Sequence, residues 1–242
     1  MRNRIKNLIK QDKIFAVPNE RSFLYNHLVE FAQTLKGKKI LDIGAGRQQY
    51  RSLFEPHNTY EACDLDNSFY PEKKPDIIAS VYDIPRENGH YDVVLLLQVL
   101  EHLEFPVKGL REIHRVLKKD GVVYLSTPQA AGDHFEPYHF FNFTQYGLQS
   151  VLSQSGFRVQ EHQRLAGMFN YVGNRIWKLG SILESQYRVN GNIIQRAFAA
   201  VFKLMCYGVG RSIALFDFLD KKKHYCIGHI VVARKVEDHD RE

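Results

Sequence analysis

The stretch Lys39-Ile40-Leu41-Asp42-Ile43-Gly44-Ala45-Gly46 decides the fold. In it an apolar run of strand length leads directly into a glycine turn. Glycine permits a sharp turn and a close approach of the backbone to a ligand, and a helix that follows such a turn presents unpaired N–H groups at its N-terminus. The stretch therefore predicts a strand, a ligand-binding turn and a helix, in that order.

The chemistry of this turn favours one kind of ligand over another. A dinucleotide fingerprint needs a third glycine at the position that Gln49 occupies. Asp42, just before the first glycine, would repel a phosphate and would attract an ammonium or a sulfonium group. We therefore expect a nucleoside that carries an amino acid rather than a dinucleotide.

Short apolar runs alternate with helical patterns on both sides of this stretch, which is typical of a parallel sheet wrapped by helices. Gly156 is placed to end one of these helices, and Thr144 to cap its start. The expected strands lie near 39–43, 59–64, 76–79, 91–97, 121–126, 157–163 and 225–234. The expected helices include 22–35, 47–54, 107–117 and 144–155.

Charge is distributed unevenly along the 242 residues, whose formal net charge is +6. Residues 1–13 carry +4, residues 14–167 carry −3, residues 168–235 carry +8 and residues 236–242 carry −3. The positive charge therefore belongs to an N-terminal arm and to one late segment, and the central part is slightly acidic. Any attraction to anions is expected of these two segments.

Composition and cysteine usage narrow the class of protein. With 44% hydrophobic and 25% charged residues, the chain has the composition of a folded globular protein. Cys63, Cys206 and Cys226 form no Cys-x-x-Cys pair and leave an odd number, which argues against a disulfide framework. The basic N-terminus is followed by no apolar segment typical of a secretory signal, so we expect a cytoplasmic protein.

An acidic residue ends the second expected strand. Asp64 follows the glycine turn by about twenty residues, which is where a ribose diol is held in nucleotide-binding folds of this type. A carboxylate can accept hydrogen bonds from both ribose hydroxyls. The alternative is that Asp64 or Asp66 only caps a turn.

Five ordered motifs resemble those of class I S-adenosylmethionine-dependent methyltransferases. They are Asp-x-Gly-x-Gly at 42–46, the acidic strand end at Asp64, Tyr-Asp-Ile-Pro at 82–85, the run 91–103 that ends in Glu-His-Leu, and Arg-Val-Leu-Lys-Lys-Asp-Gly at 115–121. The chain then resembles a bacterial-type subgroup through His134, Pro137, Tyr138, Phe141, Phe143, Thr144, Gly147 and Leu148. The resemblance covers about residues 36–165 and the last strand. It implies a three-layer Rossmann-like α/β fold with a mostly parallel seven-stranded sheet, an antiparallel last strand and a helical insertion before that strand.

The same resemblance implies S-adenosylmethionine as cofactor and assigns residues to it. Those near the methionine end would be Asp42, Gly44, Ala45 and Gly46. Those near the ribose and the adenine would be Asp64, Leu65, Ser80, Val81 and Tyr82. Leu97 and Gln98 would face the reactive methyl group. Ser80 stands where the family often has an aspartate, so backbone groups of Val81 and Tyr82 are expected to read the adenine edge.

Methyl transfer needs proximity and alignment more than a protein nucleophile. For a hydroxyl acceptor one base must lie close by, and the candidates are His102 and His134, with Glu101 orienting the first. Structural alternatives are a tether made by Glu101 and His102 and an ordinary loop role for His134. No His/Cys/Asp cluster has the spacing of metal ligands, so no metal is expected.

The chain is expected to have four parts. These are a basic arm with helices (1–36), the cofactor-binding core (37–167), an apolar and basic helical insertion (168–223), and the final strand with an acidic tail (224–242). Ile194, Ala197, Phe198, Val201 and Met205 lie at helical spacing in the insertion. Charged residues interrupt this stretch, which argues against a membrane span. The insertion is interpreted as a lid, a homodimer contact or a helix on the inner surface of an anionic membrane, or as a segment packed on the core.

The sequence thus predicts methyl transfer to an unidentified acceptor, a hydroxyl of a small molecule, a lipid-linked compound or a glycan. Nucleic acid is not expected, because no known RNA-binding or DNA-binding module accompanies the charge. Two alternatives stay open: a methyltransferase-like protein that binds the cofactor without turnover, and an NAD-dependent oxidoreductase.

Overall fold

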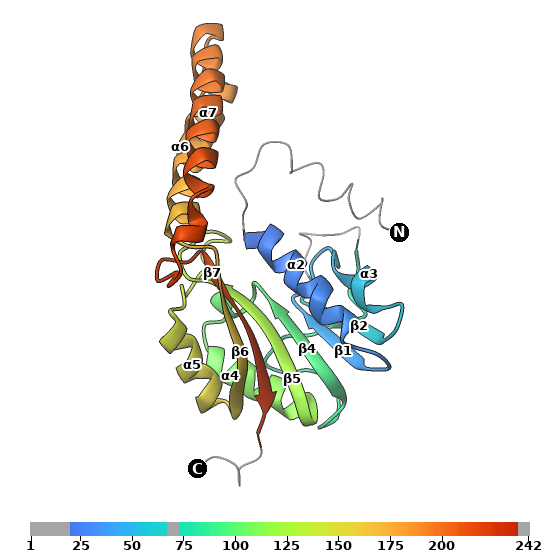
Figure 1. Cartoon of the computed structure of the whole chain (residues 1–242). Helices are drawn as coiled ribbons and strands as arrows, with labels where there is room; N and C mark the ends of the chain where they lie inside the picture. The colour runs from blue at the N-terminus through green and yellow to red at the C-terminus, as the bar shows by residue number, and fades with distance from the viewer. Residues whose placement is uncertain (1–19, 67–72, 237–242) are drawn as a thin grey trace. The chain divides into compact units, whose positions relative to one another are not determined.

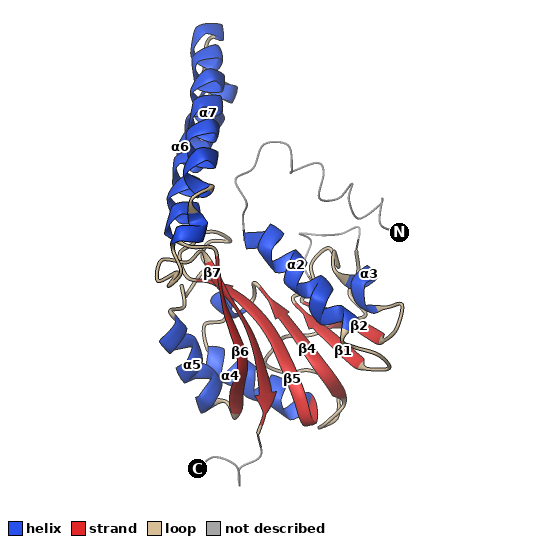
Figure 2. Cartoon of the chain, in the orientation of Figure 1, coloured by secondary structure: helices blue, strands red, loops and turns tan. Residues whose placement is uncertain are grey.

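A seven-stranded sheet forms the centre of the protein, whose structure is a computed structural model describing residues 20–66 and 73–236. The strand order is β3-β2-β1-β4-β5-β7-β6 (Figure 2). The strands are β1 Lys39–Ile43, β2 Thr59–Asp64, β3 Ile77–Ile78, β4 Tyr91–Leu97, β5 Leu117–Pro128, β6 Phe157–Leu165 and β7 Gly228–Lys235. The pairs β1–β2, β1–β4, β2–β3 and β4–β5 are parallel, and β7 runs antiparallel to β5. The expected fold class, with its antiparallel last strand, is confirmed.

Helices cover both faces of this sheet (Figure 1). They are α2 Glu20–Gln33, α3 Arg51–Phe54, α4 Pro106–Val116 and α5 Gln145–Gln154, with the short 3-10 turn η1 Leu100–His102. The chain also forms α6 Met168–Asn190, α7 Ile193–Ala214 and the 3-10 turn η2 Asp217–Leu219, which belong to another unit. As predicted, Thr144 caps α5 by accepting the Gly147 N–H at 3.1 Å, and Gly156 follows α5 with φ 82°. Pro106 is itself the first residue of α4, where its missing N–H costs no hydrogen bond.

The alternation of side chains along the strands explains how the two faces are filled. Leu41, Val94 and Val123 lie in one apolar cluster with Ile113 of α4 and Leu152 of α5. On the opposite face the ring of Tyr124 packs against Phe31 of α2, with centroids 4.6 Å apart. The sheet is therefore buried between two helical layers, as the near-continuous apolar strands require.

The order of the strands reverses between β1 and β4, which lie side by side. The connections from the carboxyl ends of these two strands leave in opposite directions, and ligands of open α/β sheets bind at such a point. The glycine turn follows β1 there, and the segment from Gln98 to Leu103 follows β4. The sheet thus brings the two motifs to one edge.

Some elements differ from those expected. β3 has only two residues, and Pro71, in the crossover before it, lies outside the described residues. β5 begins at Leu117 rather than at 121, because Leu117 pairs with Tyr91, so Gly121 lies inside a strand and does not follow a helix. The helix expected at 47–54 contains turns up to Tyr50 and is helical from Arg51.

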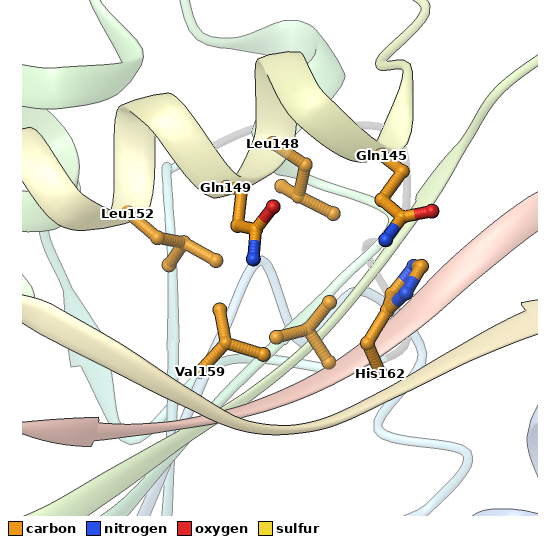
Figure 3. A pocket seen from close by; sticks show the side chains of 7 residues that line it. Gln145, Leu148, Gln149, Leu152, Val159 and His162 are labelled. Atoms are coloured by element: carbon orange, nitrogen blue, oxygen red, sulfur yellow. The ribbon is translucent and has the colours of Figure 1, made fainter.

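A small cavity of about 20 Å³ lies between α5 and the strands β6 and β7 (Figure 3). Its lining residues are Gln145, Leu148, Gln149, Leu152, Val159, His162 and Val231. His162 Nε2 lies 3.0 Å from Nδ1 of the fully buried His229. The cavity has the size of about one water molecule, so it is no substrate site.

The chain divides into two compact units. One consists of Leu24–Arg164 and Gly228–Glu242 and contains the sheet. The other contains Leu165–Ile227 and the segment before Leu24, and its described core is an α6–α7 hairpin. The four-part division expected from the sequence stays a prediction.

Glycines allow α6 and α7 to pack closely. A Cβ atom on Gly173 would lie 2.4 Å from the carbonyl oxygen of Gly210, and one on Gly180 would lie 2.8 Å from the Cα of Lys203. The face of α7 that is buried consists of the small residues Ala199, Cys206 and Gly210. The two helices therefore meet backbone to backbone, and large side chains are excluded from the contact.

The apolar stripe expected on α7 is exposed in this structure. Ile194, Phe198, Val201 and Met205 are each more than half exposed. Within the hairpin the small residues of α7 occupy the contact with α6, and the four interpretations of the insertion stay predictions. Ile193–Leu219 is also the one segment of the described chain that is long and apolar enough to cross a membrane by length and composition.

Candidate functional site

The glycine turn after β1 has a backbone shape that only glycine adopts without strain. Gly44 and Gly46 have φ angles of 66° and 49°. A Cβ atom on Gly44 would lie 2.4 Å from Cγ2 of Val99, which belongs to the segment after β4. The Gly44 N–H donates to the carbonyl oxygen of Cys63 at 2.8 Å, so the turn is fixed to the end of β2.

Asp42 is a buried carboxyl at the end of β1, only 3% exposed. The hydroxyl of Tyr60 donates a short hydrogen bond to its Oδ2. Burial raises the pKa of Asp42 to about 7, and the nearby charge of Asp64 contributes to the rise, while the Tyr60 hydrogen bond opposes it. Asp42 can therefore change its charge near neutral pH, and a cationic ligand would favour the ionised form.

Asp64 supports the glycine turn from the neighbouring strand. Its Oδ2 accepts the N–H of Gly46 at 2.8 Å, and its Oδ1 accepts the N–H of Leu65 at 2.8 Å. Leu65 is 57% exposed, which is unusual for a leucine that directly follows a core strand. The structure thus brings Asp42, Asp64, Leu65 and the glycine turn to one end of β1 and β2.

The turn from Ser80 to Asp83 holds the residues expected at the adenine edge. Ser80 and Asp83 form an isolated antiparallel bridge, and Ser80 Oγ accepts the N–H of Tyr82 at 3.2 Å. Val81 is buried beneath the turn. The Tyr82 N–H is thus bonded to Ser80 Oγ, and the expectation that backbone groups of Val81 and Tyr82 read the adenine edge stays a prediction.

Leu97 and Gln98 end β4 next to the glycine turn. Leu97 is buried, and Gln98 has a φ of 58°, which is rare for a residue other than glycine. The Gln98 N–H donates to the carbonyl oxygen of Ser126 at 2.9 Å, and its side-chain Nε2 donates to Ser126 Oγ at 3.1 Å. The side chain of Gln98 is thus bound to β5.

The three candidate catalytic residues are close together. One ligating atom each of Glu101, His102 and His134 lies within 4.8 Å of the other two. Glu101 and His102 belong to η1 after β4, and His134 belongs to the loop after β5. The rings of His102 and His134 meet edge to face with centroids 4.9 Å apart. Residues thirty-two positions apart in the sequence therefore share one site.

Both histidines have a defined orientation. His102 Nδ1 lies 2.6 Å from the carbonyl oxygen of Tyr138, and His134 Nδ1 lies 2.9 Å from that of Gly132. A carbonyl oxygen only accepts, so each Nδ1 carries the hydrogen and each Nε2 has a lone pair. Burial lowers the pKa of His102, and the neighbouring His134 and His139 lower it further, so His102 is neutral at physiological pH.

A contact that fixes the ring of His102 comes from the carbonyl oxygen of Tyr138, and the expectation that Glu101 orients His102 stays a prediction. Glu101 is fully buried, and its Oε2 accepts the hydroxyl of Thr127 at 3.1 Å. Its carbonyl oxygen accepts the N–H groups of Phe140 and Phe141. Glu101 therefore fixes the end of β5 and the following loop to η1.

Sequence reasoning missed a third histidine in this site. The ring centroid of His139 lies 4.3 Å from that of His134 and 5.8 Å from that of His102, and its side chain is 4% exposed. Asn142 closes the loop by bonding both backbone groups of Ala131. The sequence signal that could have identified His139 is its closeness to His134, five residues earlier in the same loop. The expectation of no metal site did not anticipate this cluster, which only the folded loop brings together.

A family model described as a methyltransferase domain matches residues 19–164, which is more than half of the chain. The chain is 28% identical over 135 residues to a tRNA U34 carboxymethyltransferase of Campylobacter lari, covering 50% of this chain and 46% of that protein. It is 24% identical over 142 residues to the uncharacterised methyltransferase YcgJ of Bacillus subtilis, covering 54% and 52%. The chain thus spans about half the length of the curated relatives it matches.

Solved structures share the fold at low identity. The [4+2]-cyclase SpnF superposes with a TM-score of 0.56 and 17% identity, covering 88% of this chain and 79% of SpnF. A putative sarcosine dimethylglycine methyltransferase from Galdieria sulphuraria has a TM-score of 0.54 and 18% identity, covering 87% and 83%. The sheet order, the glycine turn and the family match lead to one conclusion: the chain belongs to the class I S-adenosylmethionine-dependent methyltransferases.

Proposed function

We propose that this methyltransferase transfers the methyl group to a hydroxyl oxygen of its acceptor, at the edge of the sheet where β1 and β4 end. The observation that carries the proposal is the pair of imidazole Nε2 lone pairs on His102 and His134, held in place by backbone carbonyls. An alcohol must lose a proton as it is methylated, whereas the chemistry of a sulfonium donor needs no protein nucleophile. A neutral histidine at this edge meets that requirement.

The residues of the glycine turn fit S-adenosylmethionine. Gly44 and Gly46 leave backbone groups open to close approach, and the buried Asp42 supplies negative charge for the methionine ammonium or the sulfonium. Asp64 would accept from the ribose hydroxyls, and the exposed Leu65 would cover the adenine. When bound, S-adenosylmethionine supplies a methyl group that is already activated for in-line displacement.

The surroundings of the histidines suit proton removal. His102 and His134 would take the proton at Nε2, while Nδ1 of each remains bonded to a carbonyl oxygen. The buried carboxylate of Glu101 would stabilise the imidazolium that forms. Leu97 and Gln98 would align the reacting atoms from the end of β4.

For the acceptor we propose a lipid-linked compound or a glycan, reached at the inner surface of a membrane. The support is the α6–α7 hairpin, which exposes Phe198, Val201 and Met205 on one side of α7. The segment 168–235, which contains the hairpin, carries a net charge of +8, against +6 for the whole chain. Apolar surface together with basic residues is typical of helices that lie on anionic membranes.

A second candidate acceptor is RNA. The observation that favours it is the similarity to the tRNA U34 carboxymethyltransferase, which covers 50% of this chain. The basic segments would then contact phosphates, and binding would weaken steeply with salt.

A transfer assay separates these candidates. The purified full-length chain is incubated with methyl-labelled S-adenosylmethionine and, separately, with a lipid extract, a glycan fraction and bulk tRNA from a bacterium. We expect label in the lipid or glycan fraction, attached through oxygen. Label in tRNA alone would select the second candidate and exclude the first. Cofactor binding without transfer to any fraction would indicate a protein that binds the cofactor without turnover.

Sedimentation with vesicles tests the membrane contact. The chain is expected to sediment with vesicles that contain anionic lipid and not with neutral ones. Phe198→Ser with Val201→Ser is expected to reduce sedimentation, because both side chains are exposed on α7. Lys36→Gln, an exposed residue of the sheet unit, serves as the control. Failure of the unaltered chain to sediment would exclude the membrane role.

A further inference from the structure

We infer that Glu101, His102 and His134 form a binding site for one divalent transition-metal ion of the Zn²⁺ type. Two imidazoles and one carboxylate are a donor set that proteins use for Zn²⁺ and Fe²⁺ when a coordination position is kept for a substrate. Metal binding itself does not depend on the proposed acceptor.

The distances allow one ion to contact all three residues. Their ligating atoms lie within 4.8 Å of one another. Around a Zn²⁺ ion with bonds of about 2.1 Å, neighbouring ligand atoms lie about 3.4 Å apart. Closing this difference requires side-chain rotations and no rearrangement of the sheet, because Glu101 and His102 share one turn and His134 approaches from a loop.

The hydrogen bonds of the histidines suit a metal in particular. Metal-binding histidines almost always donate their second ring N–H to a carbonyl or carboxylate, which fixes the tautomer and directs the free nitrogen at the ion. His102 does so to Tyr138 and His134 to Gly132, in both cases through Nδ1. Two independent backbone carbonyls therefore prepare both Nε2 atoms as ligands.

His139 supplies a further observation that points to a ligand. Its side chain is 4% exposed, yet within the described part of the chain neither ring nitrogen makes a hydrogen bond. Its nearest acidic neighbour is Asp133, whose Oδ1 lies 3.5 Å from Nδ1. A buried imidazole with two unsatisfied nitrogens is costly, and a metal ion or a metal-bound water in the cluster would satisfy one of them.

The charges near the cluster are also favourable. Glu101 is fully buried and Asp133 lies at the rim, whereas the ion pairs described for the chain put no lysine or arginine in contact with these histidines. A divalent cation would balance the buried carboxylate. The site would leave at least one position open for an oxygen ligand.

The ion would give the cluster a second way to activate a hydroxyl. A divalent ion held by Glu101, His102 and His134 would make the hydroxyl of the acceptor more acidic, so that its proton would pass to solvent water. The acceptor oxygen would then bond to the methyl carbon as the S–CH3 bond breaks, and the sulfonium would leave as a neutral thioether. This use of the ion rests on the proposed function, whereas its binding does not.

The test uses Co²⁺, which reports its coordination by visible absorption, and the full-length chain after treatment with a chelator. We expect one Co²⁺ per chain, displaced by an equivalent of Zn²⁺. His102→Ala, His134→Ala and Glu101→Gln should each weaken binding by at least about tenfold. His90→Ala is the matched control, because His90 also lies beside a carboxylate, that of Glu87, but precedes β4, whereas Glu101 and His102 follow the other end of that strand.

Circular dichroism identifies any variant that fails to fold. If Glu101→Gln unfolds, His134→Ala still tests the metal site, because His134 lies in a loop. Co²⁺ binding that is absent, or unchanged in both His102→Ala and His134→Ala, would overturn the inference. Methyl transfer by the metal-free chain without any Co²⁺ binding would leave the proposed function intact and exclude the metal. Metal binding without transfer to any acceptor would retain the site and exclude the function.

Discussion

Oδ2 of Asp64 accepts the backbone N–H of Gly46 at 2.8 Å. The carboxylate assigned to the ribose therefore also fixes the turn assigned to the methionine end. The two halves of the cofactor site are coupled through one side chain.

Replacing Asp64 tests this coupling. Asp64→Ala should weaken S-adenosylmethionine binding by on the order of 1 to 3 kcal/mol, because hydrogen bonds to the ribose and to Gly46 are lost together. Calorimetric titration measures the change, with Asp66→Ala as the control on an exposed neighbouring carboxylate. If Asp64→Ala leaves the affinity for S-adenosylmethionine unaltered, Asp64 does not belong to the cofactor site.

Gly44→Ala should abolish cofactor binding and destabilise the fold. Its Cβ would lie 2.4 Å from Val99 Cγ2, and its φ of 66° is unfavourable for alanine. Gly37→Ala is the control, since Gly37 has a φ of 64° and no atom within 4 Å of the added Cβ. It should cost only the backbone strain, about 1 kcal/mol. If Gly44→Ala and Gly37→Ala lowered the unfolding temperature and the cofactor affinity equally, contact with Val99 would be unimportant.

The affinity for S-adenosylmethionine should rise with pH through neutrality. Burial raises the pKa of Asp42 to about 7, so the free protein holds this carboxyl protonated below that pH. A cationic ligand favours the ionised form, so below pH 7 the affinity should fall by up to about tenfold per unit, and above pH 8 it should level off. Asp42→Asn should bind more weakly at pH 8 and show no such dependence. A flat profile for the unaltered chain would place the cation away from Asp42.

Much of this cofactor site could be predicted because its signals are local. The apolar run 39–43, the two glycines and the acidic end of β2 each act through their own backbone, and parallel strands bring their carboxyl ends to one edge. The sequence does not show that Tyr82 donates to Ser80, since that depends on a turn only four residues long.

The histidine cluster and the face of α7 could be predicted only in part. His102 and His134 were candidates by position, but their meeting with His139 depends on the loop after β5 bonding to the carbonyl oxygen of Glu101. On α7 the apolar stripe was recognised by its period, yet the small residues decide which face packs. Periodicity identifies an apolar face and does not identify its partner.

Acid should destabilise the sheet through His229. Burial lowers the pKa of His229 to about 4, and the neighbouring His162 lowers it further, so the folded protein keeps this ring neutral. The unfolded chain binds a proton near pH 6.5, so stability is full above that pH and falls as the pH decreases toward 4. Asp42, whose pKa is raised by burial to about 7, acts in the opposite direction over this range, so the test is the difference between variants. From pH 7 to pH 5 the free energy of unfolding in urea should change less favourably in the unaltered chain than in His229→Gln, by on the order of 1 kcal/mol. The exposed His57→Gln should behave as the unaltered chain does, and equal changes in all three proteins would contradict this role.

We expect the turn after β1 to bind S-adenosylmethionine, and calorimetric titration of the chain with S-adenosylmethionine, S-adenosylhomocysteine and NAD measures this. Both adenosyl compounds should bind with one molecule per chain, and NAD should not bind. Binding of NAD alone would exclude S-adenosylmethionine as the ligand of this turn.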